Sequence, residues 1–129
     1  DVHRRRRPSH WHVLESDADL PTALRTIPQQ SSVLIDALGG FVACHLDDSD
    51  EAWNDCCEEL VEQLAGMGQT CVVVIEETGW GVVPPTLIGG RFRDRLGSLA
   101  QSLDRQAHSA WLVLQGRAVD LHALSQRVP

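Results

Sequence analysis

Residues 71–85 read CVVVIEETGWGVVPP, and this stretch decides the expected fold class. The first part, from Cys71 to Ile75, is a continuous apolar run, which is typical of a strand buried in a parallel sheet. The second part, from Glu76 to Pro85, holds two carboxylates, an indole, two glycines and a Pro-Pro pair, and this composition predicts a loop. A buried strand that leads directly into such a loop is typical of the ligand-binding edge of an open α/β sheet.

The rest of the chain alternates between strand-like and helix-like segments. Residues 33–35 form a second apolar run, which ends at Asp36 and predicts another buried parallel strand. Gly39 and Gly40 are expected to break this strand. Further strands are expected over 11–15 and 110–114. Helices are expected near 17–21, where Asp17 and Asp19 could act as caps, from 47–51 to 66, along 92–107 and over 121–124. Apolar residues at helical spacing over 53–64 and 92–107 predict one inward face on each of the two longer helices. This order predicts a single α/β domain over residues 1–129, with a mostly parallel sheet and flanking helices.

Composition narrows the class of protein. The 129 residues are 43% hydrophobic, which is enough for one domain with its own core. No apolar run reaches the roughly 18 residues of a membrane span, and no signal peptide is visible, so a cytoplasmic protein is expected. A net charge of -7 argues against nucleic acid as a partner, since nucleic-acid binding needs a basic surface.

The lysine and cysteine content limits the chemistry that these residues can perform. All 11 Lys and Arg residues are arginine, so these residues hold no lysine for a Schiff base or for a phosphate-binding P-loop. The four cysteines include the neighbours Cys56 and Cys57 but no C-x-x-C pair. Their spacing fits neither a zinc site nor a disulfide framework, and they are expected to be small, partly buried apolar residues.

Asp36 is the first candidate for ligand chemistry. An apolar run that ends in one carboxylate is the Walker-B pattern, in which the carboxylate holds Mg²⁺ directly or through water. A strand-end aspartate that only caps a turn would look the same in a sequence. The residues alone leave both interpretations open.

The loop after residues 71–75 is the second candidate. Glu77, Gly79 and Gly81 combine a carboxylate with glycines that let the backbone approach a ligand closely. The alternative is an ordinary turn in which Trp80 packs as a lid.

The N-terminal stretch is the third candidate. His3 stands beside four arginines, Arg4 to Arg7. A guanidinium group can donate two parallel hydrogen bonds to phosphate oxygens. A histidine beside such groups could attack the α-phosphate of a nucleotide. From composition alone a frayed, solvated basic terminus is the simpler interpretation. His10 and His12 have no nearby Cys or Glu to complete a metal site.

Five stretches agree in order and spacing with one known family. They are HRRRRPSHW (3–11), VLID (33–36), ETGWGVVP (77–84), RFRD (91–94) and WLVLQG (111–116). The third stretch matches E-x-G-x-G-[IV]-V-P, and the fourth follows it at the distance of the family's F-R-D. Together they resemble the bifunctional adenosylcobinamide kinase / adenosylcobinamide-phosphate guanylyltransferase family of cobalamin assembly.

The resemblance implies a RecA-like P-loop fold, ATP and GTP as substrates, Mg²⁺ as cofactor, adenosylcobinamide as partner molecule and a homo-oligomer, expected to be a trimer. One implied reaction phosphorylates the aminopropanol hydroxyl of adenosylcobinamide. The other transfers GMP to the product through a guanylylated histidine. The residues that match are His3 for the histidine, Asp36 for the carboxylate near the metal, and Glu77, Gly79 and Gly81 for the ligand loop. Arg4 and Arg7 are the candidates for phosphate binding beside His3. Arg93 and Asp94 match without an assignable role.

The chain also departs from the family pattern. The opening strand and the G-G-x-R-S-G-K-S loop are absent from these residues, so residues 1–129 alone are expected to catalyse neither reaction. The family's T-L-W-V-T-N reads GGFVAC at 39–44, Glu76 stands in place of an Asn, and Ala100 stands in place of the Asn before Gln101. The alternative function is a non-catalytic nucleotide-binding or regulatory domain that has lost the P-loop.

Overall fold

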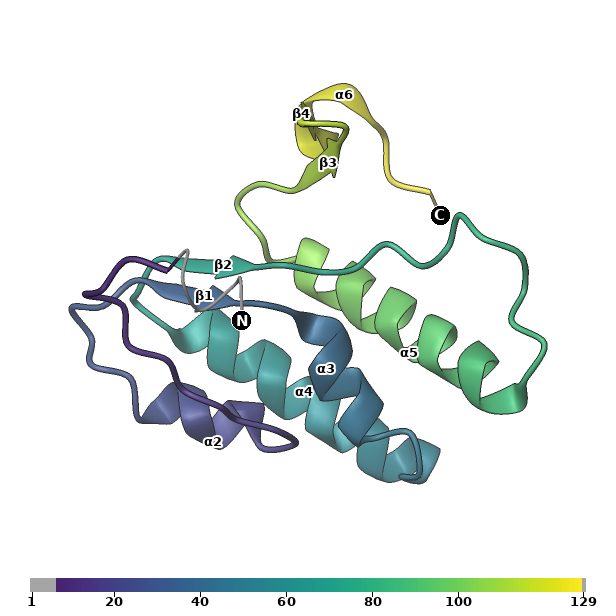
Figure 1. The fold of residues 1–129 in the computed structure, drawn as a ribbon, viewed down its shortest axis with the longest axis horizontal. Coiled ribbons are helices and arrows are strands. Elements are labelled where there is room, and N and C mark those ends of the chain that lie inside the picture. The colour runs from purple at the N-terminus through teal and green to yellow at the C-terminus, as the bar shows by residue number, and fades with distance from the viewer. Residues whose placement is uncertain (1–6, 129) are drawn as a thin grey trace.

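The fold was examined in a computed structural model that describes residues 7–128. Short strands alternate with helices along the chain (Figure 1). The elements are α2 (Leu20–Arg25), β1 (Val33–Ile35), α3 (Leu38–Cys44), α4 (Asp50–Gly66), β2 (Cys71–Val73), α5 (Leu87–Asp104), β3 (Trp111–Leu114), β4 (Arg117–Asp120) and α6 (Leu121–Leu124). Among these described residues, no helix is long and apolar enough to cross a membrane.

The parallel sheet expected from the two apolar runs is present. β1 and β2 pair in parallel, with Val33 opposite Cys71 and Ile35 opposite Val73. Figure 1 shows α2, α3 and α4 together on one side of these strands. Val33 and Ile35 point into the core, whereas Leu34 is 44% exposed and Val72 is 54% exposed. Within the described residues, the expectation that these two strands are buried therefore holds for one face of β1 only.

The core lies between the inner face of this sheet and the helices. Its buried side chains include Leu20 and Leu24 of α2, Leu38, Phe41 and Val42 of α3, Trp53 and Leu60 of α4, and Leu96 and Leu99 of α5. The apolar spacing in α4 and α5 predicted these inward faces correctly, because residues three and four apart share one side of a helix.

Side-chain caps set where the longer helices begin. Ser49 Oγ accepts the Ala52 N–H at the start of α4, and Thr86 Oγ1 accepts the Gly89 N–H at the start of α5, each at 3.2 Å. Asp19 caps α2 in the same way, as expected from the sequence. A capping oxygen satisfies a backbone donor that has no partner inside its own helix.

Two local expectations are corrected. Residues 11–15 are an extended segment without strand pairing, because their backbone meets no neighbouring strand and three of their apolar side chains are exposed. Gly39 and Gly40 do not break the strand but lie inside α3, because β1 already ends at Ile35. The reason at Gly39 is a close approach by another segment, described below.

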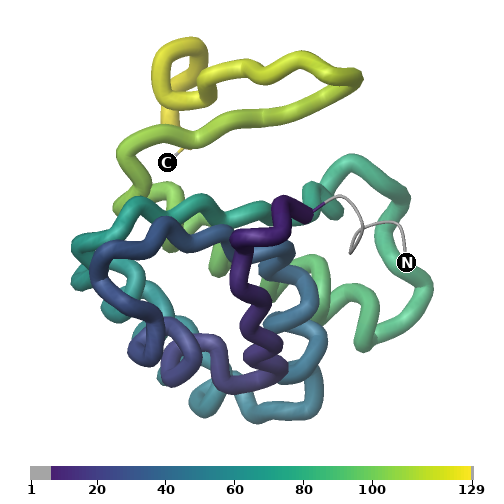
Figure 2. Tube along the Cα trace, turned by 60° about the vertical axis from the view of Figure 1, so that its left-hand side comes forward, coloured from purple at the N-terminus to yellow at the C-terminus, as the bar shows by residue number. Residues whose placement is uncertain are grey.

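The third expected strand, over 110–114, is also corrected. β3 is not part of the parallel sheet but pairs antiparallel with β4, with Trp111 opposite Asp120 and Leu114 opposite Arg117. Gln115 and Gly116 connect the two strands, with φ of 51° and 73°, as in a two-residue hairpin of the primed type. This tight turn returns the chain onto β3 itself, and Figures 1 and 2 show the hairpin projecting from the rest of the fold.

Candidate functional site

The candidate site lies at the carboxyl ends of the two parallel strands. Because β1 and β2 run the same way, the residues that follow each strand meet at one edge of the sheet. The Val74 N–H donates to the carbonyl oxygen of Ile35, and the Leu38 N–H donates to the carbonyl oxygen of Val74, both at 2.9 Å. The turn that carries Asp36 is therefore held on both sides by the segment that continues β2.

Asp36 itself is exposed and projects from this turn. The residue at the N-cap of α3 is Ala37, which offers no side-chain cap. Within residues 7–128, no hydrogen bond or ion pair engages the Asp36 carboxylate, so the structure does not use it as a turn cap.

Asp36 could supply one carboxylate ligand to Mg²⁺. In the described part of the chain, no three acidic, His or Cys side chains come close enough to form a complete metal cage. Mg²⁺ commonly takes one or two carboxylates and completes its octahedron with water and phosphate oxygens. A single unengaged carboxylate at a strand end fits that mode of binding, in which the nucleotide supplies the remaining ligands.

Glu76 contacts α3 three residues after Asp36. Its Oε2 accepts the N–H of Gly39 at 2.8 Å, which ties the loop after β2 to the first turn of α3. From the sequence, Glu76 was expected in the candidate ligand loop and noted as a departure from the family pattern, but its contact with α3 was not predicted. No local signal predicts this contact, because the two residues are 37 positions apart.

The loop residues Glu77, Gly79 and Gly81 differ in their local contacts. The Gly79 N–H donates to Glu77 Oε1 at 2.6 Å, and a Cβ on Gly79 would lie 2.8 Å from that oxygen. A Cβ on Gly81 would meet open space. Trp80 is 64% exposed, so it does not pack as a lid over this loop.

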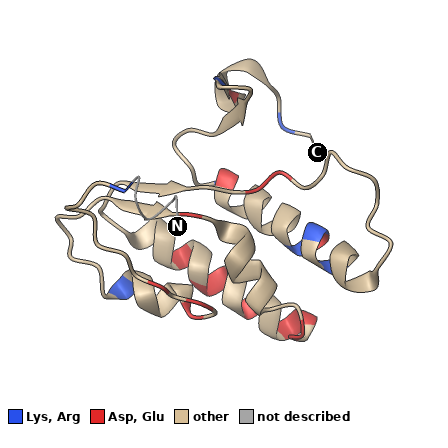
Figure 3. Ribbon diagram, in the orientation of Figure 1, with Lys and Arg blue, Asp and Glu red and all other residues tan. Residues whose placement is uncertain are grey.

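A wide hollow of about 790 Å³ lies between the start of α4, the segment before α5 and the first turns of α5. Val83, Pro84, Arg91 and Asp94, all from the two motif stretches at 77–84 and 91–94, contribute to its lining. In the ribbon of Figure 3, acidic residues (red) recur along α4, and arginines (blue) lie in the first half of α5.

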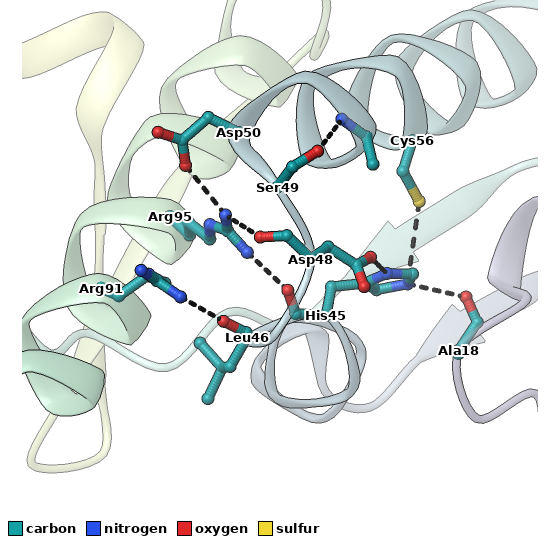
Figure 4. Close-up of polar contacts among 10 residues, drawn as sticks. Ala18, His45, Leu46, Asp48, Ser49, Asp50, Cys56, Arg91 and Arg95 are labelled. Carbon is teal, nitrogen blue, oxygen red and sulfur yellow. Dashed lines mark hydrogen bonds and ion pairs between the residues drawn. The ribbon is translucent and has the colours of Figure 1, made fainter.

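The arginines of the RFRD stretch and its neighbour have distinct partners. Arg93 pairs with Asp94 at 2.7 Å, and Arg91 donates to the carbonyl oxygen of Leu46 at 2.8 Å. Arg95 is buried and donates to the carbonyl oxygens of His45 and Asp48 (Figure 4). Arg95 was not predicted as a buried residue, although it lies three residues after Phe92 and four before Leu99, spacings that put it on the apolar face of α5.

His45, Asp48 and Cys56 form a second cluster, also drawn in Figure 4. His45 Nδ1 lies 2.7 Å from Asp48 Oδ2, and its Nε2 lies 2.9 Å from the carbonyl oxygen of Ala18 and 3.7 Å from Cys56 Sγ. Burial, and after it the nearby carboxylate of Glu59, raises the pKa of the Cys56 thiol. Because the thiolate is the reactive form, this cluster is unsuited to nucleophilic chemistry and serves to connect α3, α4 and the segment before α2.

Of the N-terminal candidates, Arg7 lies within the described residues. His3 and Arg4 lie outside the described residues. Arg7 is described and exposed, and no hydrogen bond or ion pair of the described residues links it to Asp36 or Glu77. Of the predicted site residues, the structure thus brings Asp36 to the same sheet edge as the start of the 76–85 loop.

A short parallel sheet with helices, an unengaged carboxylate at the end of one strand and a glycine-containing loop after the next define an α/β protein with its candidate ligand face at the strand ends. Residues 1–121 match the family model for cobinamide kinase / cobinamide phosphate guanyltransferase, and the chain belongs to that family.

Curated relatives bear related names. The bifunctional adenosylcobalamin biosynthesis protein CobU of Escherichia coli (strain K12) is 29% identical over 134 residues, covering 92% of this chain and 74% of the relative. The bifunctional adenosylcobalamin biosynthesis protein CobP of Pseudomonas aeruginosa is 30% identical over 121 residues, covering 92% of this chain and 70% of the relative. The bifunctional adenosylcobalamin biosynthesis protein CobU of Salmonella typhimurium is 27% identical over 134 residues, covering 92% of this chain and 74% of the relative.

Proposed function

We propose that this chain belongs to an enzyme of cobalamin biosynthesis that phosphorylates adenosylcobinamide and then transfers GMP from GTP to the phosphorylated product. The observation that carries the proposal is the position of Asp36: an unengaged carboxylate at the end of a parallel strand, beside the loop that begins at Glu76, in a member of the cobinamide kinase / cobinamide phosphate guanyltransferase family. A RecA-like arrangement is part of the proposal, because it puts nucleotide phosphates at this sheet edge.

In the kinase reaction, Asp36 would hold Mg²⁺ together with the phosphates of ATP. The metal ion would neutralise charge that develops on the β- and γ-phosphate oxygens. Glu77, Gly79 and Gly81 would form the wall that faces the ligand. Since residues 1–129 contain no lysine, an ammonium group for the phosphates would have to come from outside them.

In the transferase reaction, a ring nitrogen of His3 would attack the α-phosphorus of GTP. A P–N bond forms, the bond from the α-phosphorus to the bridging oxygen breaks, and pyrophosphate leaves. A phosphate oxygen of adenosylcobinamide phosphate then attacks the same phosphorus and releases the histidine. Arg4 and Arg7 would bind phosphate oxygens and offset the charge of the transition state.

The experiment uses the full-length protein and two substitutions. After incubation with GTP and Mg²⁺, intact-mass measurement should detect a GMP adduct that is absent in His3→Ala. ATP-dependent phosphorylation of adenosylcobinamide should depend on Mg²⁺ and fall about 100-fold or more in Asp36→Asn, as expected when a metal or electrostatic group is removed. An adduct that survives His3→Ala, or phosphorylation unaffected by Asp36→Asn, would overturn the corresponding role.

We also propose a homo-oligomer, with a trimer as the expected state. Trp80 and Trp111 are exposed and support it, since aromatic residues are enriched at interfaces. Trp53 gives no support, because it is buried in the core of one chain. Light scattering on the full-length protein at tens of micromolar tests the proposal, and a monomer at that concentration would contradict it.

A second candidate function is a nucleotide-binding or regulatory domain without catalysis. It is favoured by the GGFVAC stretch at 39–44, which lacks the hydroxyl and amide groups of the family's T-L-W-V-T-N. This candidate predicts binding of Mg-nucleotide without phosphorylation of adenosylcobinamide and without an adduct. Calorimetric binding measured beside the two assays separates the two functions.

A further inference from the structure

Two residues at which this chain departs from the family pattern meet in space. Gly39 belongs to the first turn of α3, and Glu76 belongs to the loop after β2. The Gly39 N–H donates to Glu76 Oε2 at 2.8 Å across 37 positions of sequence. Gly39 is buried, and Glu76 reaches it from the exposed edge of the sheet.

A side chain at position 39 would have to displace the Glu76 carboxylate. A Cβ built on Gly39 would lie 2.7 Å from Glu76 Oε2 and 2.8 Å from both Cδ and Oε1. All three carboxylate atoms thus occupy the space where a side chain at position 39 would begin. The neighbouring Gly40 has no atom within 4 Å of such a Cβ, so the close approach is specific to Gly39.

The same contact helps to hold the turn that carries Asp36. The first N–H groups of a helix have no partner within the helix and need one from elsewhere. In α3 these donors are taken by the β2 side of the fold: the Leu38 N–H by the Val74 carbonyl, and the Gly39 N–H by the Glu76 carboxylate. Ala37, at the N-cap, contributes no side-chain acceptor.

We propose that Glu76 is a positioning residue for Asp36, and that Gly39 is glycine because the Glu76 carboxylate occupies its side-chain space. The carboxylate and the Val74 carbonyl together fix the start of α3, and with it the direction in which Asp36 leaves β1. This inference rests on the proposed function for the role of Asp36 in holding Mg²⁺. The contact itself is independent of that function.

The test compares Glu76→Ala with Glu76→Gln in the full-length protein. The measured quantity is the Mg²⁺ concentration that gives half the maximal rate of ATP-dependent phosphorylation of adenosylcobinamide. Removing a partner that orients a metal ligand costs about 10-fold or more in metal affinity, so Glu76→Ala should raise this concentration about 10-fold. Glu76→Gln keeps an acceptor oxygen and should restore most of the wild-type value. The KM for adenosylcobinamide should stay unchanged in both.

Gly39→Ala and Gly40→Ala form a matched pair in one helix. Alanine favours a helix more than glycine at both positions, so Gly40→Ala should raise the melting temperature. Gly39→Ala should melt lower than Gly40→Ala, because the Glu76 carboxylate must move away and the N–H at position 39 loses its acceptor. The double variant Gly39→Ala/Glu76→Ala should melt higher than Gly39→Ala alone, since the colliding group is removed.

Several outcomes would overturn the proposal. If Glu76→Ala lowers the melting temperature but leaves the Mg²⁺ dependence unchanged, Glu76 is merely structural and does not position Asp36. If Gly39→Ala and Gly40→Ala melt alike, the carboxylate does not occupy the space at position 39. A wild-type protein that does not phosphorylate adenosylcobinamide would instead overturn the proposed function, and the melting comparison would still decide whether the contact exists.

Discussion

The guanidinium of Arg95 lies over the indole of Trp53, with its Cζ 5.2 Å from the ring centroid. Both side chains are only 5% exposed, so a charge on α5 is buried against the aromatic core of α4. The same guanidinium binds the carbonyl oxygens of His45 and Asp48 in the connection between α3 and α4 (Figure 4). Its ion pair with Asp50, a side chain that is 94% exposed, adds little.

Arg95→Met should lower the free energy of unfolding by about 2 kcal/mol or more. Methionine keeps most of the packing but leaves two partly buried carbonyl groups without these donors and removes the cation–π contact. Urea unfolding measures the loss. The matched control is Arg105→Met, at an exposed position near the end of α5, which should change the free energy by less than about 0.5 kcal/mol. Equal effects would show that the Arg95 contacts do not stabilise the fold.

Leu38→Ala should destabilise the protein by about 2–5 kcal/mol, because it leaves a cavity in the core. Leu38 is fully buried at the start of α3, immediately after the turn of Asp36. Leu87→Ala removes the same atoms at a position that is 96% exposed and should be nearly neutral. Chemical denaturation of both variants provides the comparison, and a neutral Leu38→Ala would contradict the core assignment.

Gly116→Ala should destabilise the β3–β4 hairpin by about 1 kcal/mol, because an L side chain resists positive φ. Gly116 has φ of 73°, and nothing lies within 4 Å of a Cβ placed there, so any loss comes from backbone conformation and not from a collision. Gly116→Asn should cost less, since asparagine tolerates this region. If the two variants unfold at the same urea concentration, the turn geometry is not responsible.

The cysteines should govern the alkaline stability of this protein. Burial raises the pKa of Cys57 to about 12, with a further rise from the neighbouring Cys56 and an opposing effect of Arg95. Burial also raises the pKa of Cys71. The chain has no tyrosine and no lysine, the side chains that otherwise titrate near pH 10.

The sign of the pH effect follows from linkage. An unfolded Cys57 loses its proton near its ordinary pKa of 9.0, whereas the folded one keeps it to about 12, so rising pH between these values favours the unfolded state. The urea midpoint of the wild type should therefore fall between pH 8 and pH 10.5, and fall less in Cys57→Ala. Cys44→Ala, which alters an exposed thiol, should behave like the wild type. An equal fall in Cys57→Ala would contradict the burial of this thiol.

The sequence by itself determined the features that depend on neighbouring residues. The apolar runs at 33–35 and 71–73 are strands, Asp19 caps a helix, and the inward faces of α4 and α5 follow from spacing. These features are local, because a helix face or a cap involves residues within a few positions of each other. The family likewise followed from motifs read in order along the chain.

Only the tertiary structure decided what depends on segments that meet across the fold. It showed that β3 pairs with β4 instead of joining β1 and β2, that one face of the parallel sheet is exposed, and that Arg95 is buried. It also showed that Gly39 is glycine where a carboxylate 37 residues away occupies its side-chain space. The physical reason is that hydropathy and spacing describe what a segment prefers, whereas burial, strand partners and close approaches are set by which distant segments pack together.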